Sequence, residues 1–374
     1  MSVISQFFPS SEGGGSSSKM DVDVFILSGG GGAAITDSNY LSVCQQSGHG
    51  GGGAVFQGTI PIQPGSTVPI VVGGGGAGAG PSPQTTNTNG AIGGCSKLTF
   101  PEGTICVAGG GGGAHGQLSI GDLNSVYWTT FGDPTTYDPY KGTHSAGTGG
   151  SGGCCSSPNT GWMQSGPGSA PVPAGEGGRS IYSNGHFAHR ILNDIDPTGN
   201  IIKSLQFEGT SVQNHKYGQF SGGPGAGGAI CLYPTTSNGY RWNSQASGGA
   251  GGAGQTTLGG YGNNSLVYQA TAGKGICTDM TGTLAEYGRG RAFMPDACWQ
   301  VYCNGEANYG AGGVARDNTA GHSNGGNGGS GTVIVRYPDQ FAAAPASPGA
   351  TDCSPATPGY YTYRFNSTGS ITLP

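Results

Sequence analysis

Short apolar runs that lead straight into glycines are the main pattern along this chain. Residues 22–27 (Val-Asp-Val-Phe-Ile-Leu) and residues 68–72 each run into four consecutive glycines. Residues 55–62 and 68–72 flank a Pro-Gly-Ser turn, which is the pattern of a β-hairpin. Residues 332–337 form a further apolar run directly after a glycine-rich stretch. The pattern predicts short β-strands that feed repeatedly into glycine runs.

Helices are nearly excluded by composition. Glycine makes up 80 of the 374 residues and proline 23, and each glycine inside a helix costs about 1 kcal/mol relative to alanine. The stretch closest to a 3.6-residue apolar period, residues 191–202, is interrupted by Pro197 and Gly199. We therefore expect an all-β protein.

The glycine runs themselves predict a second kind of structure. Extended polyglycine adopts the polyproline-II backbone, which has three residues per turn and no internal hydrogen bonds. Such helices pack closely because they lack side chains, and their backbone groups then pair with neighbouring helices. Apolar strands anchor the runs, which favours ordered packing over flexible linkers. The expected fold is a short-stranded, β-sandwich-like sheet combined with a packed bundle of polyglycine (polyproline-II) helices and long aromatic loops.

Composition divides the chain into four parts. Residues 1–18 are an apolar peptide followed by a Gly/Ser linker, and residues 19–337 are the glycine-rich domain. Residues 338–358 are a Pro/Ala-rich tether, and residues 359–374 are a C-terminal strand segment. The linker separates the apolar peptide from the body, which predicts docking on another protein; a frayed terminus is the alternative. The candidate docking residues are Ile4, Phe7 and Phe8.

Three inserted segments, around residues 117–140, 180–220 and 285–309, have fewer glycines and more aromatic residues. Aromatic side chains supply contact area at low entropic cost, so we expect surface-recognition loops. The alternative is that the aromatic residues cover the ends of the glycine bundle as a small core. The candidate recognition residues are Tyr127, Trp128, Phe131, Tyr137, Tyr140, Trp162, Phe187, Tyr240, Trp242, Trp299 and Tyr302.

Charge and hydropathy exclude several partners. The net charge is −5 and the 14 Lys and Arg residues are scattered, which argues against nucleic-acid binding. No apolar run approaches the roughly 20 residues of a membrane helix, so we expect no membrane insertion, and the first residues do not resemble a secretory signal. Most of the ten cysteines are expected to be reduced.

Catalytic patterns occur, but in the wrong context. His49 with the three glycines after it resembles a lipase oxyanion loop, and the Gly-x-Ser-x-Gly around Ser151 resembles a nucleophile elbow. An elbow lies between a strand and a helix, whereas Ser151 lies in a glycine tract. His186 and His189 lack the neighbours of a zinc site, and Asp194 with Asp196 is a weak calcium pattern. We expect no enzyme, no catalytic residue, no metal and no cofactor.

The order of the motifs resembles a known family. Residues 27–32, 50–53 and 64–76, together with the closing strand at 328–337, resemble the glycine-rich domain of phage tail proteins and adhesins over about residues 20–337. Residues 4–9 look like the start of cyanophage virion structural proteins. The resemblance implies polyglycine-II cores with variable host-contacting loops, although members also serve as plain structural parts.

The C-terminus carries a pattern that such phage domains usually place before their first strand. It is an aromatic residue followed by Ser or Thr, Gly and Pro, and here it spans residues 365–374. We therefore expect residues 361–373 to return to the sheet that contains residues 22–27, as in a circular permutation. The same strand pairing is also possible with a neighbouring subunit, and a mobile tail is the remaining alternative.

These features together predict a phage virion structural protein of the tail, fibre or appendage apparatus. It would assemble in the host cytoplasm and be exposed extracellularly on the particle. Its partners would be other virion proteins, itself, and a host-surface glycan or protein bound by the aromatic loops. The main alternative is a structural adaptor or capsid decoration protein without receptor binding. An ice-binding polyglycine protein would need regular glycine spacing and a flat Thr-rich face, and neither is evident.

Overall fold

The computed structural model describes part of the chain. The described residues are 19–33, 49–80, 90–101, 103–107, 109–110, 112, 154–156, 163–165, 211–215, 217–222, 247–251, 255–262, 265–291, 304–314, 325–345, 347–352 and 357–374. The strands are β1 (Met20–Leu27), β2 (Val55–Ile62), β3 (Thr67–Val71), β4 (Ser96–Phe100), β5 (Gly103–Val107), β6 (Cys154–Ser156), β7 (Met163–Ser165), β8 (Ser211–His215), β9 (Gly218–Gly222), β10 (Gln255–Gly262), β11 (Ser265–Thr271), β12 (Ile276–Thr278), β13 (Ala285–Tyr287), β14 (Thr332–Pro338), β15 (Ala350–Asp352), β16 (Tyr360–Phe365) and β17 (Gly369–Thr372).

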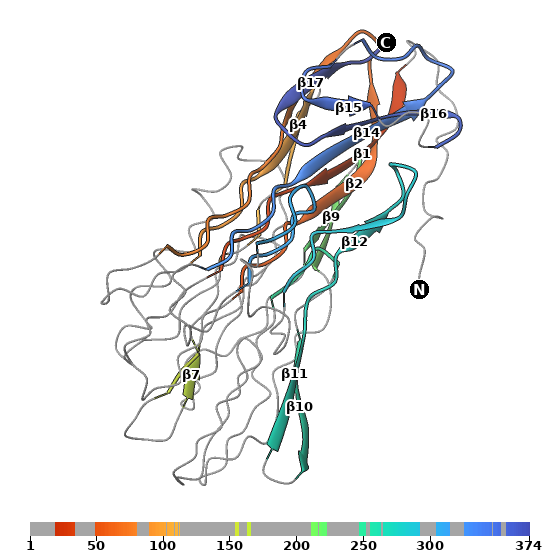
Figure 1. Cartoon of the computed structure of the whole chain (residues 1–374). Coiled ribbons are helices and arrows are strands. Elements are labelled where there is room, and N and C mark those ends of the chain that lie inside the picture. Colours follow the sequence, from red (N-terminus) through yellow and green to blue (C-terminus); the bar gives the residue numbers. More distant parts are fainter. Residues whose placement is uncertain are drawn as a thin grey trace.

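The described residues contain strands and no helix, so the all-β expectation is confirmed there. A seven-stranded sheet has the order β15-β16-β14-β1-β2-β9-β8, and a four-stranded sheet has the order β17-β3-β4-β5 (Figure 1). All of their strand pairs are antiparallel. In the larger sheet, β1 lies between β14 and β2, with Val24 opposite Val335 and Gly58.

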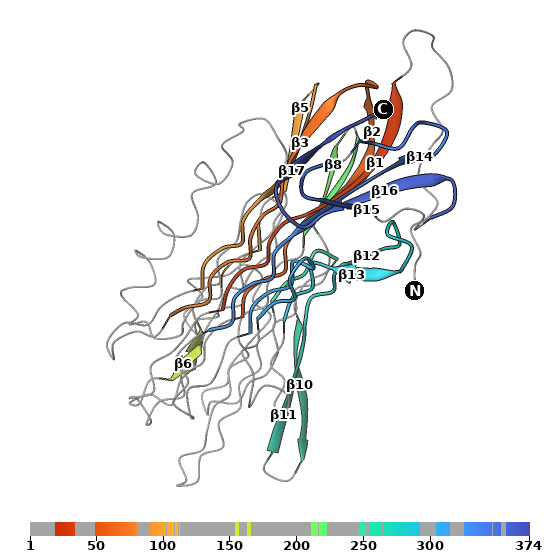
Figure 2. The same ribbon diagram turned by 45° about the horizontal axis from the view of Figure 1, so that its top comes forward.

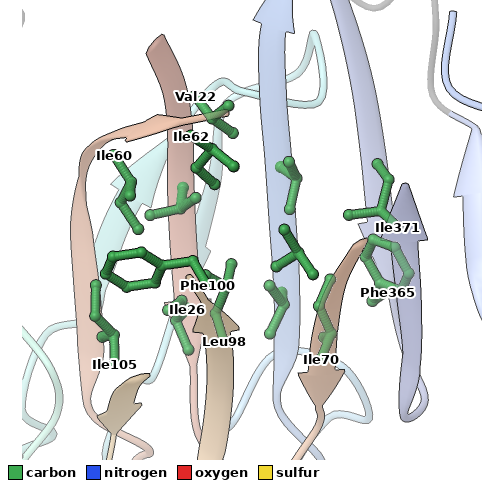
Figure 3. Close-up of a cluster of buried hydrophobic side chains, with 14 of the residues drawn as sticks. Val22, Ile26, Ile60, Ile62, Ile70, Leu98, Phe100, Ile105, Phe365 and Ile371 are labelled. Carbon is green, nitrogen blue, oxygen red and sulfur yellow. The ribbon is translucent and has the colours of Figure 1, made fainter. Parts of the chain in front are cut away.

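One apolar cluster takes side chains from both sheets (Figure 3). Alternate residues of β1, including Val22, Val24 and Ile26, point into it, as period-two alternation requires. Ile70 and Leu98 enter it from the smaller sheet. The cluster therefore fixes which face of each strand is buried, and with it the register of the strands.

The other face of the seven-stranded sheet packs a smaller cluster against the β12–β13 hairpin. Phe25 lies 5.2 Å from Tyr287 between ring centroids, and Tyr287 stacks on Tyr309 at 5.1 Å. The guanidinium of Arg364, from β16, lies 5.8 Å and 5.5 Å from the centroids of these two tyrosine rings. This cluster joins the hairpin to the C-terminal part of the chain.

The C-terminal segment contributes to both sheets. β16 pairs with β14 in the sheet that contains β1, so β14 lies between them. β17 pairs with β3 in the smaller sheet. Between β14 and β16 the tether packs Phe341 and Ala344 against the main core.

The structure places strands where the sequence pattern suggested loops. β8 and β9 fall within the aromatic insert at 180–220 and extend the larger sheet beyond β2. β13 begins at residue 285, within a third expected insert. These strands are short and rich in polar residues, so they lack the apolar alternation that marks β1 or β14.

Candidate functional site

Glycine-rich segments continue from the strand ends and run side by side away from the sheets (Figures 1 and 2). We call this set of segments the glycine array. Its members are residues 28–33, 49–54, 73–80, 90–95, 109–110 with 112, 247–251, 310–314 and 325–331.

The central segment, residues 28–33, donates its backbone hydrogen bonds to three neighbouring segments in rotation. Residues three positions apart donate to the same neighbour, over N···O distances of 2.8 to 3.1 Å. Ser28 and Gly31 donate to residues 54 and 51, Gly29 and Gly32 to residues 94 and 91, and Gly30 and Ala33 to residues 329 and 326. The hydrogen-bond direction of this segment therefore repeats every three residues.

Three other segments donate to the carbonyl groups of the central segment. Gly76 and Ala79 donate to the carbonyls of residues 30 and 33, again three positions apart. Gly110 donates to the carbonyl of residue 29, and Gly313 donates to that of residue 31. The central segment thus has six neighbours, and its six N–H groups and the carbonyls of residues 29, 30, 31 and 33 are paired with backbone groups of those neighbours.

The packing leaves no space for side chains at the centre of the array. A Cβ added at Gly29 would lie 2.0 Å from the carbonyl oxygen of Gly74, and one added at Gly32 would lie 2.0 Å from that of Ala77. At Gly74, by contrast, an added Cβ would meet nothing within 4 Å. In segment 73–80, positions 74, 77 and 80 are exposed while 73, 76 and 79 are buried. Glycine is therefore sterically required wherever the added Cβ would face a neighbouring segment, and this includes the exposed Gly75, whose Cβ would meet the carbonyl of Gly328.

A serine hydroxyl joins the array to the sheets. The backbone N–H of Gly73 donates to Ser96 Oγ over 2.9 Å, and Ser96 Oγ donates to the carbonyl of Leu27 over 2.7 Å. The N–H groups of residues 76 and 79 donate to the carbonyls of residues 30 and 33. Three residues earlier in each segment, the same pattern would pair the N–H of Gly73 with the carbonyl of Leu27. Ser96 bridges this pair where the strands diverge from the array.

A second serine fastens an outer part of the array near a buried histidine. Ser247 Oγ donates to the carbonyl of Gly50 over 2.7 Å and accepts from the backbone N–H of Arg291 over 2.7 Å. Arg291 Nε donates to the carbonyl of Gly312 over 2.9 Å. His49 is fully buried beside them, and burial first, then the positive charge of Arg291, lowers its pKa to about 4. The imidazole is thus neutral near pH 7.

Backbone N–H groups that follow His49 already donate hydrogen bonds within the array. Gly50 donates to the carbonyl of Gly313 and Gly52 to that of Gly248, each over 2.9 Å. These N–H groups are therefore not available to hold an oxyanion. Ser151, His186, His189, Asp194 and Asp196 lie outside the described residues. No group of three or more potential metal ligands occurs in the part of the chain that the structure describes.

The sequence-predicted docking and recognition residues all lie outside the described ranges. They are Ile4, Phe7, Phe8, Tyr127, Trp128, Phe131, Tyr137, Tyr140, Trp162, Phe187, Tyr240, Trp242, Trp299 and Tyr302. Ser96, Ser247 and Arg364, which connect parts of the array and sheets, were not predicted from the sequence. The only local signal for the two serines is that each stands beside a glycine run or a strand start.

Three array segments are also hydrogen-bonded to one another at residues far from the sheets. Residues 33, 79 and 325 are linked there, because Ala79 donates to the carbonyl of Ala33 and Gly325 donates to that of Ala79. Residues 34–48 follow Ala33 in the chain, and residues 315–324 precede Gly325. Residues 34–48 and 315–324 therefore each join two array segments on the side away from the sheets, whereas β2–β3 and β4–β5 join array segments on the sheet side.

Comparisons with known proteins give one match. Residues 15–338 match a family described as a glycine-rich domain. Neither a curated protein nor a solved structure matches the chain. Among the described residues, no helix has the length and apolar character needed to cross a membrane.

A matched pair of substitutions tests the packing of the array. Gly29→Ala places a methyl group against the Gly74 carbonyl and should lower the free energy of unfolding by about 3 kcal/mol or more. Gly74→Ala meets open space and should be neutral or stabilise by about 0.4–1 kcal/mol, since it restricts the unfolded chain. Urea unfolding measures both values. Equal losses in the two variants would contradict the inward and outward assignment.

The buried histidine predicts a pH dependence of stability. The unfolded chain takes up a proton on His49 below about pH 6.5, whereas the folded chain resists it until about pH 4. His49 stabilises the fold fully above pH 6.5, and this contribution is lost as the pH falls from 6.5 to 4, by at most about 3 kcal/mol. His49→Gln should make the free energy of unfolding, measured by urea unfolding at each pH, change less with pH over this range than it does in the parent protein. Parallel curves for parent and variant would show that His49 is not buried in its neutral form.

Proposed function

The chain belongs to the glycine-rich domain family, and on that premise we propose that it is a structural protein of a bacteriophage virion. In this proposal it forms part of the tail, fibre or appendage apparatus and presents aromatic loops for attachment to the host surface. It has no catalytic role and requires no cofactor. The observation that carries the proposal is the two-ended organisation of the molecule around the glycine array.

We propose that the glycine segments are polyglycine-II helices and that the two sheets form a β-sandwich. The three-residue repeat of the hydrogen bonds supports the helix assignment, because a polyproline-II backbone has three residues per turn. The six neighbours of residues 28–33 support hexagonal packing of these helices. The apolar cluster shared by the two sheets supports the sandwich.

The two ends of the body suit different tasks. β1 runs from Met20 to Leu27 and continues into the central array segment, so Met20 lies at the sheet end remote from the array. The N-terminal segment therefore joins the body at that end, where the turn at residues 63–66 and Leu373 also lie. The connections at residues 34–48 and 315–324 start on the opposite side. A protein anchored by residues 4–9 would direct those connections outward.

The array supports such a role because it tolerates long insertions. Its segments are held by backbone hydrogen bonds along their length, so the cost of closing a longer connection grows only slowly with its length. In this proposal residues 113–153 and 223–246, which lie outside the described residues, form long connections of the same kind. Most of the candidate recognition residues lie in or near such connections, in the manner of binding loops on a rigid scaffold.

Loss of aromatic side chains from residues 113–153 should impair attachment. Phage carrying Tyr127→Ala and Trp128→Ala should assemble normally but bind host cells with at least about tenfold lower affinity, which corresponds to about 1.4 kcal/mol of lost binding free energy. Leu284→Ala removes an exposed leucine from the β12–β13 hairpin and should leave adsorption unchanged. Unchanged adsorption in the double variant, with antibody labelling of the protein at the neck or capsid, would instead support an adaptor or decoration protein.

Removal of the apolar N-terminal peptide should prevent incorporation into particles. A chain lacking residues 1–9 should keep the thermal unfolding midpoint of the parent, because β1 begins at Met20. Immunoblots of purified particles should then show little or none of the shortened protein. Replacement of Ser16, Ser17 and Ser18 by alanine is the matched control and should leave incorporation intact. Normal incorporation of the shortened chain would refute docking through Ile4, Phe7 and Phe8.

A further inference from the structure

The last 18 residues, 357–374, complete both sheets at once. β16 lies along β14, from Val333 opposite Phe365 to Pro338 opposite Tyr360. β17 lies along β3, with Ile371 opposite Val68. Without residues 357–374, β14 and β3 would both present unpaired backbone groups at a sheet edge.

The same residues also close the main apolar core. Tyr363, Phe365, Ile371 and Leu373 are buried members of the cluster shared by the two sheets, and Phe365 and Ile371 are seen beside Ile70 in Figure 3. Their side chains fill the space between β14 and β3. The segment therefore occupies a groove whose floor is apolar and whose two walls are strand edges.

Specific polar contacts fix the segment in this groove. Thr332 Oγ1 donates to the carbonyl of Phe365 over 2.9 Å, and Arg364 Nη2 donates to the carbonyl of Asn308 over 3.1 Å. At the other end, Leu373 N donates to the carbonyl of Ser66 and Gly65 N donates to the carbonyl of Leu373, each over 3.0 Å. Contacts thus extend from the start of β16 to the end of the chain.

The segment lies outside the part of the chain that matches the glycine-rich family. The match ends at residue 338, the last residue of β14, whereas β16 and β17 span residues 360–372. Both sheets of the family domain thus depend on strands that come from beyond it. Donor and groove are distinct parts of the sequence that meet through non-covalent contacts.

We propose that residues 357–374 are a donor segment and that the groove between β14 and β3 accepts this segment from a second copy of the chain. The contacts of β16 and β17 are the same whichever copy supplies the segment, so exchange adds no new interface. At low protein concentration the chain's own segment outcompetes that of a second copy, because it is tethered to the groove and so has a high effective concentration there. Exchange links neighbouring copies when they are held close together.

The experiment uses the full-length protein with a protease site in place of residues 353–356 and an N-terminal affinity tag. The folded protein is cut in the presence of excess fluorescent peptide with the sequence of residues 357–374, so that the groove is never left empty. We expect the labelled peptide to replace the native segment and to remain bound to the tagged chain. A peptide with Phe365→Asp and Ile371→Asp is the matched control, and at least tenfold less of it should be retained.

The second step tests whether another copy can act as donor. The cut, tagged protein is mixed with an uncut, untagged chain that carries its own fluorescent label, and the tag is then recovered. We expect the untagged chain to be captured at least tenfold more than by uncut tagged protein. Excess parent peptide should abolish this capture, and the doubly substituted peptide should not.

Two results would overturn the proposal. If the parent and substituted peptides are retained equally, the groove does not recognise the segment. If the parent peptide binds but the second copy is not captured at any protein concentration, the segment acts only within its own chain. Neither result bears on particle attachment, so this test is independent of the proposed virion function.

Discussion

The pairing of buried backbone groups is the constraint on which this molecule depends. The buried side chains of the glycine array are few and mostly small, such as Ala33, Ala54 and Ala79, so its stability rests largely on backbone hydrogen bonds between segments. Residues 28–33 meet this demand by donating to three neighbours and accepting from three others. Glycine loses more conformational entropy on ordering than any other residue, and the dense network of contacts offsets that loss.

The sheets fix the order and register of the glycine segments, which the array cannot fix alone. Glycine segments carry no side-chain information that would fix their order or register. The strands do, because the alternation of β1 buries Val22, Val24 and Ile26 in a core shared by both sheets and a shift by one residue would expose them. Leu27 then passes directly into Ser28, so the register set in the sheet is carried into the array. Ser96 maintains this continuity at the junction.

The sequence allowed prediction of the strands with strong apolar runs, such as those at 22–27 and 332–337, because burial dictates their pattern. It did not allow prediction of β8 and β9, because their sequences lack apolar alternation and they join the sheet by pairing of β9 with β2 and of β8 with β9. The glycine runs predicted close packing, but runs of identical residues cannot specify which of them lie next to each other in the fold. Ser247 is hydrogen-bonded to Gly50, 197 positions away in the sequence, and to Arg291, 44 positions away. Local sequence patterns carry no information over such separations.

The direction of the hydrogen bonds in the array also determines how the protein responds to force. They run between segments that lie side by side, so tension along the segments loads them in shear and many bonds share the load together. The central segment is connected to six neighbours, and a pull on either of its ends spreads sideways into all of them within six residues. A molecule built in this way resists extension along its length far better than it resists peeling of an outer segment. Mechanical failure should therefore begin at segments such as 73–80, which have one side open to solvent.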